Sequence, residues 1–173
     1  GVAYADEGVE LRKAGISLPI LVLNPELSAM PDMVKYTLEP EIYSFKRLRE
    51  FAEHVTGCGE KDFPIHLKLE TGMNRLGFTE EELPQLIAEL QSIQVLKVES
   101  VFSHLAASDE ALHDDFTRKQ IAQFEQMSGQ LEAALPYTFW RHLANSAAIS
   151  RFPEAHFNLV RLGISLYGAA SNE

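Results

Sequence analysis

The chain alternates between short runs of β-branched or aromatic residues and longer stretches with apolar residues every three or four positions. The short runs have the composition of strands, and the longer stretches have the periodicity of amphipathic helices. Strands that alternate with helices in this way indicate an α/β fold with a parallel sheet. The predicted strands are Gly1–Ala5, Pro19–Asn24, Ile42–Phe45, Ile65–Glu70, Val101–Leu105, Phe139–Asn145 and Leu159–Tyr167. The helices predicted between them include Glu7–Ala14, Lys46–Val55, Glu80–Ile93 and Asp115–Ala134.

Two of these helices carry further local signals. Thr79 and Glu82 have the spacing of a capping box, which predicts the start of a helix there. The last predicted helix has apolar residues at spacings of three to five, which predicts that one of its faces packs in the core. These core residues are Phe116, Ile121, Phe124, Met127 and Leu131.

Seven predicted strands in 173 residues indicate an incomplete barrel. A complete (β/α)8 TIM-type barrel takes roughly 250 residues, so this chain is expected to lack one βα unit. The Gly-rich phosphate motifs of nucleotide-binding open sheets do not occur in the sequence. Because the sequence begins with Gly rather than Met and opens inside a predicted strand, we expect residues 1–173 to be one partial barrel domain of a longer protein.

Charge and composition narrow the classes of partner. The chain has 15 Lys and Arg residues against 25 Asp and Glu residues, a formal net charge of −10. Such a field repels nucleic acids and anionic lipid headgroups, so neither is an expected partner. A single cysteine excludes an intramolecular disulfide, and no apolar run reaches the length of a membrane-spanning helix. These features favour a soluble, cytoplasmic protein.

The strand Ile65–Glu70 carries the first candidate chemistry. Its apolar residues alternate strictly with His66, Lys68 and Glu70, so the ionisable side chains share one face. In a barrel the apolar face meets the helices, and the ionisable face then points inward. Buried ionisable groups need partners to offset their desolvation, so this face predicts a functional site inside the barrel.

Polar residues also end the later strands. His104 lies at the carboxyl end of one strand, His142 lies in the next strand with Ser146 directly after it, and Arg161 and Gly163 lie in the last. Barrels often bind phosphate at the loops after their last two strands, and a glycine lets backbone N–H groups approach phosphate oxygens closely. Two cations, Arg161 and the earlier Arg75, also favour an anionic ligand. An alternative is purely local, with Ser146 capping a helix that starts at Ala147 and Gly163 bending a strand.

Four motifs carry a family resemblance. They are His-Leu-Lys-Leu-Glu-Thr-Gly-Met-Asn-Arg-Leu-Gly-Phe at 66–78, Ser-His-Leu-Ala-Ala-Ser-Asp-Glu at 103–110, Ala-Asn-Ser-Ala-Ala at 144–148 and Leu-Val-Arg-Leu-Gly-Ile-Ser-Leu-Tyr-Gly at 159–168. In this order and spacing they closely resemble the barrel domain of bacterial alanine racemase, from Gly1 to Gly168. The resemblance implies a (β/α)8 barrel that binds pyridoxal 5′-phosphate (PLP), a following β-rich domain and a homodimer. It also implies interconversion of L- and D-alanine by two-base proton transfer at Cα, which supplies D-alanine for peptidoglycan.

The resemblance assigns roles to four side chains around the cofactor ring. Arg75 resembles the arginine that contacts the PLP phenolic oxygen and the substrate carboxylate. Lys68 resembles a lysine that is often carbamylated to position that arginine, although an ion pair with Glu70 is an open alternative. His104 resembles the histidine that lies against the ring. Arg161 resembles the arginine that faces the pyridine nitrogen, where a cation weakens the electron sink and so favours plain proton exchange.

The resemblance assigns the phosphate of the cofactor to residues of the last two motifs. Ser146 and the backbone of Gly163 and Ile164 resemble the family's phosphate cradle, and Asn145 is assigned to the same cofactor site. Two positions depart from the common family pattern, with Glu70 in place of Asp and Leu162 in place of Pro.

Both catalytic bases of the resemblance lie outside this sequence. The lysine that holds the cofactor belongs to the family's first strand, and the second base is a tyrosine from the C-terminal domain of the partner subunit. We therefore expect residues 1–173 alone to be inactive and to bind PLP weakly or not at all.

Two other functions compete with this one. A barrel hydrolase with two metal ions bridged by a carbamylated lysine would use Lys68 with His104 and His142 as ligands. Its disadvantage is the cation Arg161 beside such a metal site. The third possibility is a non-enzymatic PLP-binding barrel of the PLP-homeostasis type, since fold alone does not fix function.

Overall fold

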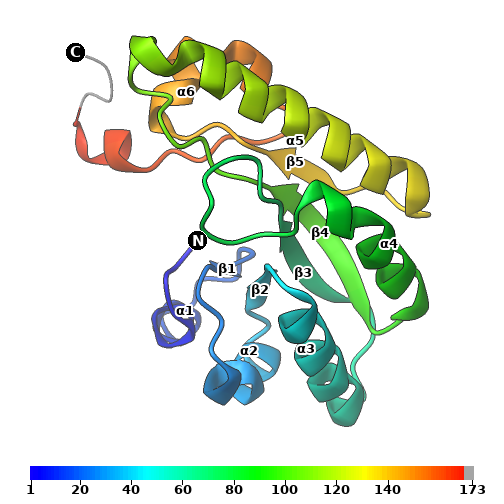
Figure 1. Cartoon of the computed structure of the whole chain (residues 1–173). Helices are drawn as coiled ribbons and strands as arrows, with labels where there is room; N and C mark the ends of the chain where they lie inside the picture. Colours follow the sequence, from blue (N-terminus) through cyan, green and yellow to red (C-terminus); the bar gives the residue numbers. More distant parts are fainter. Residues whose placement is uncertain (170–173) are drawn as a thin grey trace.

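A parallel five-stranded sheet forms the centre of the computed structural model, which describes residues 1–169. The strands lie side by side in sequence order (Figure 1). They are β1 (Leu21–Val22), β2 (Glu39–Ile42), β3 (Phe63–Lys68), β4 (Leu96–Phe102) and β5 (Trp140–His142). Residues 170–173, the end of the predicted domain, lie outside the described residues.

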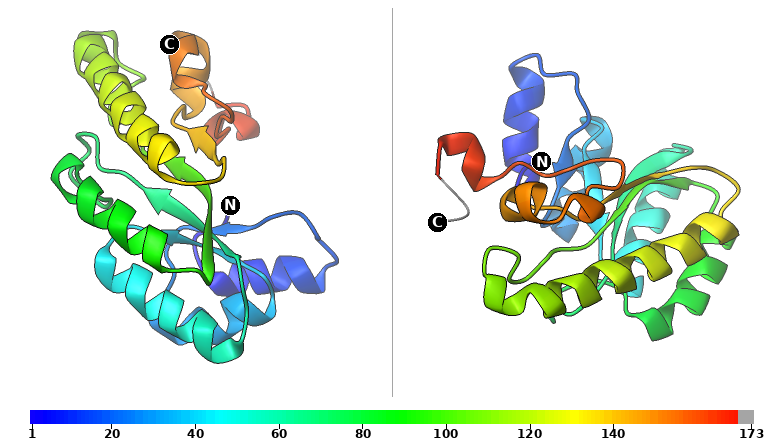
Figure 2. Two further views of the ribbon diagram at one scale, coloured as in Figure 1. Left: turned by 90° about the vertical axis from the view of Figure 1, so that its right-hand side faces the viewer. Right: turned by 90° about the horizontal axis from the view of Figure 1, so that it is seen from above.

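Helices follow the strands, and α3, α4 and α5 lie along the convex side of the curved sheet (Figure 2). The α-helices are α1 (Ala5–Lys13), α2 (Met30–Lys35), α3 (Phe45–Cys58), α4 (Leu83–Ser92), α5 (Asp114–Ala134) and α6 (Ser146–Arg151). The 3₁₀ turns are η1 (Leu27–Ala29), η2 (Glu80–Glu82), η3 (Ala111–His113), η4 (Pro153–Ala155) and η5 (Ile164–Tyr167). This repeated βα order confirms the predicted α/β class and the incomplete barrel.

The two outermost predicted strands are wrong as strands. Val2 and Leu159 each form a single parallel bridge, to Val22 and His142 respectively. The rest of the first segment turns into α1 at Ala5, and the end of the last forms η5. Each segment thus pairs with the sheet at one residue before the chain turns away. Five strands and two bridges therefore replace the seven predicted strands.

Two inner strands are also displaced by several residues. The predicted strand Val101–Leu105 starts five residues after the start of β4 and overlaps it only at Val101 and Phe102. The predicted strand Ile42–Phe45 begins at the residue where β2 ends. Ser44 caps α3 instead, because its side chain accepts a hydrogen bond from the backbone N–H of Arg47. The capping box of Thr79 and Glu82 is confirmed, although it opens with the turn η2 before α4.

The core lies between the sheet and the helices on its convex side. Ile65 and Leu67 of β3 are fully buried, as the alternation predicts. The predicted core residues of α5 are also buried, except Phe116, which is 39% exposed. Phe116 lies over the loop after β3, where a Cβ atom on Gly72 would come within 3.2 Å of its ring.

A β-bulge changes the pairing between β3 and β4. Ile65 pairs with Val98, but His66 pairs with Ser100, so Glu99 has no partner across the ladder. One extra residue reverses the side-chain alternation of β4 beyond this point. Ser100 and Phe102 therefore share the concave face with His66 and Lys68, and this face holds the site described next.

Candidate functional site

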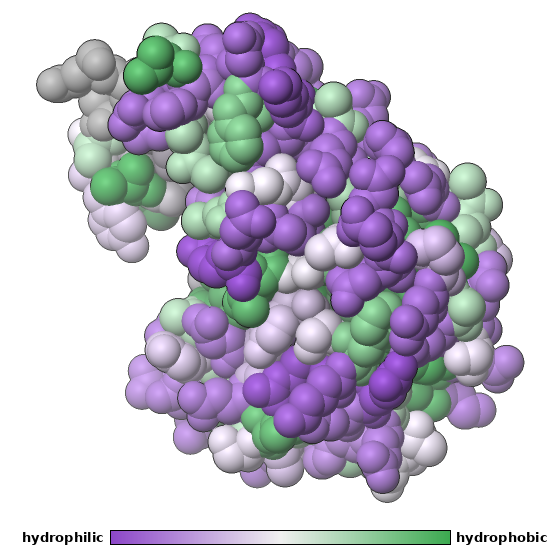
Figure 3. Space-filling model, viewed as in Figure 1, coloured by the Kyte–Doolittle hydropathy of each residue, from purple (hydrophilic) through white to green (hydrophobic). Residues whose placement is uncertain are grey.

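A cavity of about 360 Å³ opens at the carboxyl ends of the strands. Figure 3 shows the molecule hollowed on its left side, between α1 below and the segment that carries η5 above. The cavity is lined by Leu23, Asn24, Glu41, Lys68, Arg75, Leu76, Phe102, His104 and Arg161. The structure therefore brings four predicted site residues together, namely Lys68, Arg75, His104 and Arg161.

Arg161 is held firmly by backbone and ring acceptors. Its guanidinium donates to the carbonyls of Ser103, His142 and Leu143, and Nη1 also lies 2.7 Å from Nδ1 of His142. Burial lowers the pKa of Arg161 to about 10, and the carboxylate of Glu41 opposes that shift. The group is thus a fixed cation at neutral pH.

Lys68 forms a buried ion pair that the sequence did not predict. Its Nζ lies 3.0 Å from Oε1 of Glu41, whereas Glu70 was the expected alternative partner. Both side chains are almost fully buried, with 8% of Lys68 and 1% of Glu41 exposed. Burial raises the pKa of Glu41, and the charges of Lys68, Arg75 and Arg161 oppose this rise. Glu41 is therefore the carboxylate that these three cations share.

Glu70 shapes the loop that carries Arg75. Its carboxylate accepts hydrogen bonds from the backbone N–H groups of Gly72 and Arg75. Burial alone raises the pKa of Glu70, but the loop's N–H donors lower it overall. The loop also needs Gly77, which has φ +130° and lies so close to Leu69 that a Cβ atom would come within 2.6 Å of its carbonyl carbon. Arg75 is exposed at the rim of the cavity.

His104 and Phe102 give the cavity its aromatic lining. Burial, followed by the charges of Arg161, Arg75 and Lys68, lowers the pKa of His104 to about 4. His104 is therefore neutral at pH 7. The Phe102 ring lies 5.4 Å from Lys68 Nζ and 5.3 Å from the Arg161 guanidinium, both within cation–π range.

The residues predicted to bind a phosphate lie close to one another. Ser146 Oγ accepts a hydrogen bond of 2.9 Å from the backbone N–H of Gly163, and Ile164 follows at the start of η5. Arg161 lies at the same end of the sheet, since its backbone N–H donates to the carbonyl of Ala144. Asn145 caps α6 through the N–H of Ala148. The helix therefore begins at Ser146, and Asn145, rather than Ser146, is its cap.

Three buried polar side chains of the sheet escaped the sequence prediction. Glu41 lay just before the predicted strand boundary, and Glu39 and Ser100 were not singled out at all. The segment Glu39-Pro40-Glu41 places two carboxylates inside a β-strand, where charged residues are uncommon unless paired. That is the signal by which Glu39 and Glu41 could have been found. No sequence signal marks Ser100, because its inward orientation depends on the bulge.

The comparison with known families decides the classification. The model of the family described as "Alanine racemase, N-terminal domain" matches residues 1–171. The chain belongs to this family. Members of the alanine racemase family depend on PLP, as the motifs implied, and the match favours the racemase interpretation over the metal hydrolase and the PLP-homeostasis barrel.

Individual alanine racemases agree with this classification. The chain is 40% identical over 170 residues to the alanine racemase of Carboxydothermus hydrogenoformans, which covers 96% of this chain and 45% of that protein. The structure of Clostridium difficile 630 alanine racemase in complex with cycloserine matches with a TM-score of 0.89 and 37% identity, over 97% of this chain and 46% of that one. Alanine racemase from E. faecalis matches with a TM-score of 0.83 and 32% identity, over 97% and 45% respectively. The chain thus spans about half the length of the relatives it matches.

The geometry of His142 also argues against the metal-site alternative. Its Nδ1 faces Arg161 at 2.7 Å and its Nε2 faces Ser100 Oγ at 2.8 Å, so both ring nitrogens are already engaged. A metal ligand needs one free nitrogen lone pair. Separately, no helix within residues 1–169 is long and apolar enough to cross a membrane.

Proposed function

We propose that this chain is the cofactor-binding part of a longer PLP-dependent alanine racemase, which interconverts L- and D-alanine and supplies D-alanine for peptidoglycan. The observation that carries the proposal is the grouping of Arg75, His104 and Arg161 around one cavity in a chain of this family.

The cavity has the chemistry that PLP needs. Lys68, Arg75 and Arg161 outnumber the one carboxylate, Glu41, so the lining is positive and suits a ligand with phosphate and carboxylate groups. Its volume of about 360 Å³ lies in the range of small-molecule sites, and the flat ring of Phe102 suits a planar heterocycle. The residues present therefore fit the cofactor.

We assign the ring end of the cofactor to the arginines and His104. When bound, PLP supplies the electron sink that acidifies the Cα–H bond of the amino acid. Arg161 faces the pyridine nitrogen and, as a fixed cation, keeps it unprotonated, which favours proton exchange over other reactions. Arg75 binds the phenolic oxygen and the substrate carboxylate, a task suited to its planar fork. His104 is neutral and packs against the ring. Lys68, to which the resemblance gives a positioning role, lies in the same cavity and is held there by Glu41.

We assign the phosphate to the segment around α6. Ser146 Oγ and the N–H groups of Gly163 and Ile164 are the donors that we assign to the phosphate, and the Gly163 N–H, which donates to Ser146 Oγ at 2.9 Å, would turn to the phosphate when it is bound. Asn145 supports them by fixing the start of α6, because its side chain also accepts from Ser108 and donates to the carbonyl of Leu105.

In this proposal the two catalytic bases belong to parts of the parent protein outside residues 1–173. Racemisation needs a base on each face of the substrate, which the resemblance assigns to a first-strand lysine and to a tyrosine of the partner subunit. We therefore propose a homodimeric, cytoplasmic parent protein that does not bind nucleic acid. Residues 1–173 alone are inactive in this proposal.

A racemisation assay on the full-length protein that carries this chain tests the function. PLP-dependent formation of D-alanine from L-alanine supports it. Stoichiometric PLP without racemisation would instead indicate a PLP-homeostasis protein. Activity that follows bound zinc or nickel, measured by metal analysis, would indicate the hydrolase.

A further inference from the structure

Four consecutive hydrogen bonds run from the cavity across the concave face of the sheet, from β5 to β2. Nη1 of Arg161 lies 2.7 Å from Nδ1 of His142, and Nε2 of His142 lies 2.8 Å from Oγ of Ser100. That oxygen lies 2.6 Å from Nδ1 of His66, whose Nε2 lies 2.7 Å from Oε2 of Glu39. We call these five residues the polar chain. Its members other than Arg161 are all less than 9% exposed and lie on four adjacent strands, β5 to β2.

The direction of every bond in the polar chain follows from its two ends. Arg161 can only donate, so Nδ1 of His142 accepts and its proton lies on Nε2. That Nε2–H donates to Ser100, and the hydroxyl proton of Ser100 donates to Nδ1 of His66. The remaining Nε2–H of His66 then donates to the carboxylate of Glu39. A protonated His66 would leave the hydroxyl proton of Ser100 without an acceptor, so both histidines are neutral Nε2–H tautomers.

The bulge in β4 makes the polar chain continuous. Without it, His66 would lie opposite Glu99, whose side chain is 39% exposed and pairs with Lys97. The extra residue places Ser100 opposite His66 instead. A backbone irregularity in the centre of a parallel sheet thus serves to align one hydroxyl between two imidazoles.

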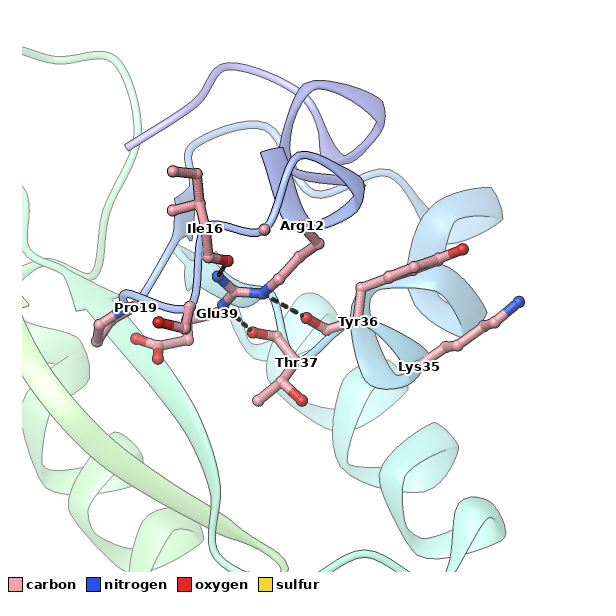
Figure 4. Close-up of a pocket in the computed structure, with 9 residues that line it drawn as sticks. Arg12, Ile16, Pro19, Lys35, Tyr36, Thr37 and Glu39 are labelled. Carbon is pink, nitrogen blue, oxygen red and sulfur yellow. Dashed lines mark hydrogen bonds between the residues drawn. The ribbon is translucent and has the colours of Figure 1, made fainter. Parts of the chain in front are cut away.

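Glu39 is available for His66 because the neighbouring cation Arg12 makes its hydrogen bonds to backbone carbonyls instead. Glu39 also borders a second cavity of about 600 Å³ near the start of β2, together with Arg12 (Figure 4). Four hydrogen bonds from the Arg12 guanidinium end on backbone carbonyls, those of Ile16, Leu18, Tyr36 and Thr37. The carboxylate of Glu39 therefore accepts the hydrogen bond from His66 at the end of the polar chain, and it does not form an ion pair with Arg12.

We propose that Glu39, His66 and Ser100 are positioning residues for Arg161. They fix His142 in the tautomer whose Nδ1 accepts from the guanidinium, and so hold that cation in the cavity. In the other tautomer an N–H proton would point at Arg161 and displace it. That Arg161 faces PLP rests on the proposed function, whereas the tautomers and the position of Arg161 do not.

The first test needs no cofactor and measures the histidines directly. In the full-length protein, labelled with ¹⁵N at its histidines, ring nitrogen shifts at pH 7 should show neutral Nε2–H tautomers for both His66 and His142. A protonated ring or an Nδ1–H tautomer at either residue would overturn the proposal, whether or not the protein binds PLP.

The second test measures the effect on the cavity with a matched set of variants. Ser100→Ala removes the hydroxyl, and we expect a mixture of His142 tautomers and PLP binding weaker by about threefold to tenfold, the value of one lost hydrogen bond. Ser100→Thr keeps the hydroxyl and should restore both properties. Ser92→Ala, an exposed serine at the end of α4, is the control and should change neither.

Two variants of Glu39 distinguish the effect of its hydrogen bond to His66 from the effect of its negative charge. Glu39→Gln keeps a carbonyl acceptor for His66 and should preserve the tautomers, whereas Glu39→Ala should not. Unchanged tautomers in both Ser100→Ala and Glu39→Ala would refute the positioning role. If wild-type protein binds no PLP while the tautomers are as stated, the proposed function fails and the polar chain stands.

Discussion

Nζ of Lys68 lies 3.0 Å from Oε1 of Glu41, in an ion pair that is almost completely buried. This pair bears on the carbamylation that the resemblance implied for Lys68. Carbamylation joins a neutral lysine amine to CO₂ with loss of a proton and produces an anion. Glu41 stabilises the ammonium form of Lys68 and would repel the carbamate. The ion pair therefore opposes the modification.

We accordingly predict that Lys68 is largely unmodified in the wild-type protein. Glu41→Gln should raise the carbamylated fraction, because it removes the competing anion. ¹³C NMR in labelled bicarbonate detects the carbamate directly. Glu50→Gln on the exposed face of α3, where Glu50 also pairs with Lys46, is the control and should have no effect. A fully carbamylated wild-type Lys68 would contradict this prediction.

The loop that carries Arg75 should depend on Gly77. A side chain there would adopt φ +130° and meet backbone atoms of Leu69 and Glu70 at 2.6 and 2.7 Å. Gly77→Ala should therefore lower the free energy of unfolding by roughly 2 kcal/mol or more and weaken PLP binding through Arg75. Thermal unfolding and PLP titration measure the two effects.

Gly129→Ala provides the matched control for that substitution. Gly129 lies within α5, and nothing lies within 4 Å of a Cβ atom built on it. Alanine should stabilise the helix by about 0.5–1 kcal/mol there and leave PLP binding unchanged. If Gly77→Ala behaved like Gly129→Ala, the loop would not need its glycine.

Acid should destabilise the fold through His104. Its pKa is about 4 in the folded state and near 6.5 when unfolded, so the neutral folded form is favoured above pH 6.5. As the pH falls from 6.5 toward 4, the unfolded chain binds a proton that the folded chain does not. Stability is therefore lost over this window, by about 2 kcal/mol at pH 5.

His104→Gln removes this titration, and comparison with wild type isolates it. The difference in free energy of unfolding between wild type and His104→Gln should be constant above pH 7. Below pH 6.5 wild type should lose stability relative to the variant. Curves that stay parallel down to pH 5 would show that His104 titrates normally. His142, with a pKa lowered to about 2 mainly by burial and then by the charge of Arg161, extends the same trend to lower pH.

Local patterns account for what the sequence predicted well. Strict alternation in β3 revealed the inward-facing His66 and Lys68, since a period of two leaves no freedom once one face is apolar. The capping box at Thr79 and the residues of the four motifs are also local signals. These predictions could be made from the sequence because each depends only on residues that are close together in the chain.

Contacts that depend on the register between neighbouring strands could not be predicted from the sequence. Lys68 pairs with Glu41 rather than Glu70 because β2 lies beside β3, while Glu70 bends back to hold its own loop. Ser100 faces inward only because of the bulge. The two end segments were mispredicted as well, since Val2 and Leu159 each pair with the sheet at a single residue.

Reaction partitioning in an Arg161 variant tests most directly whether this cavity is a PLP site with a cation at the ring nitrogen. In the full-length protein, Arg161→Glu should let that nitrogen be protonated, deepen the electron sink and raise transamination relative to racemisation. Arg161→Lys keeps the positive charge and should partition like wild type. Rates of D-alanine and pyruvate formation, measured together, give the ratio. A higher share of pyruvate in Arg161→Glu alone is the predicted result, and an unchanged ratio would contradict the placement of Arg161.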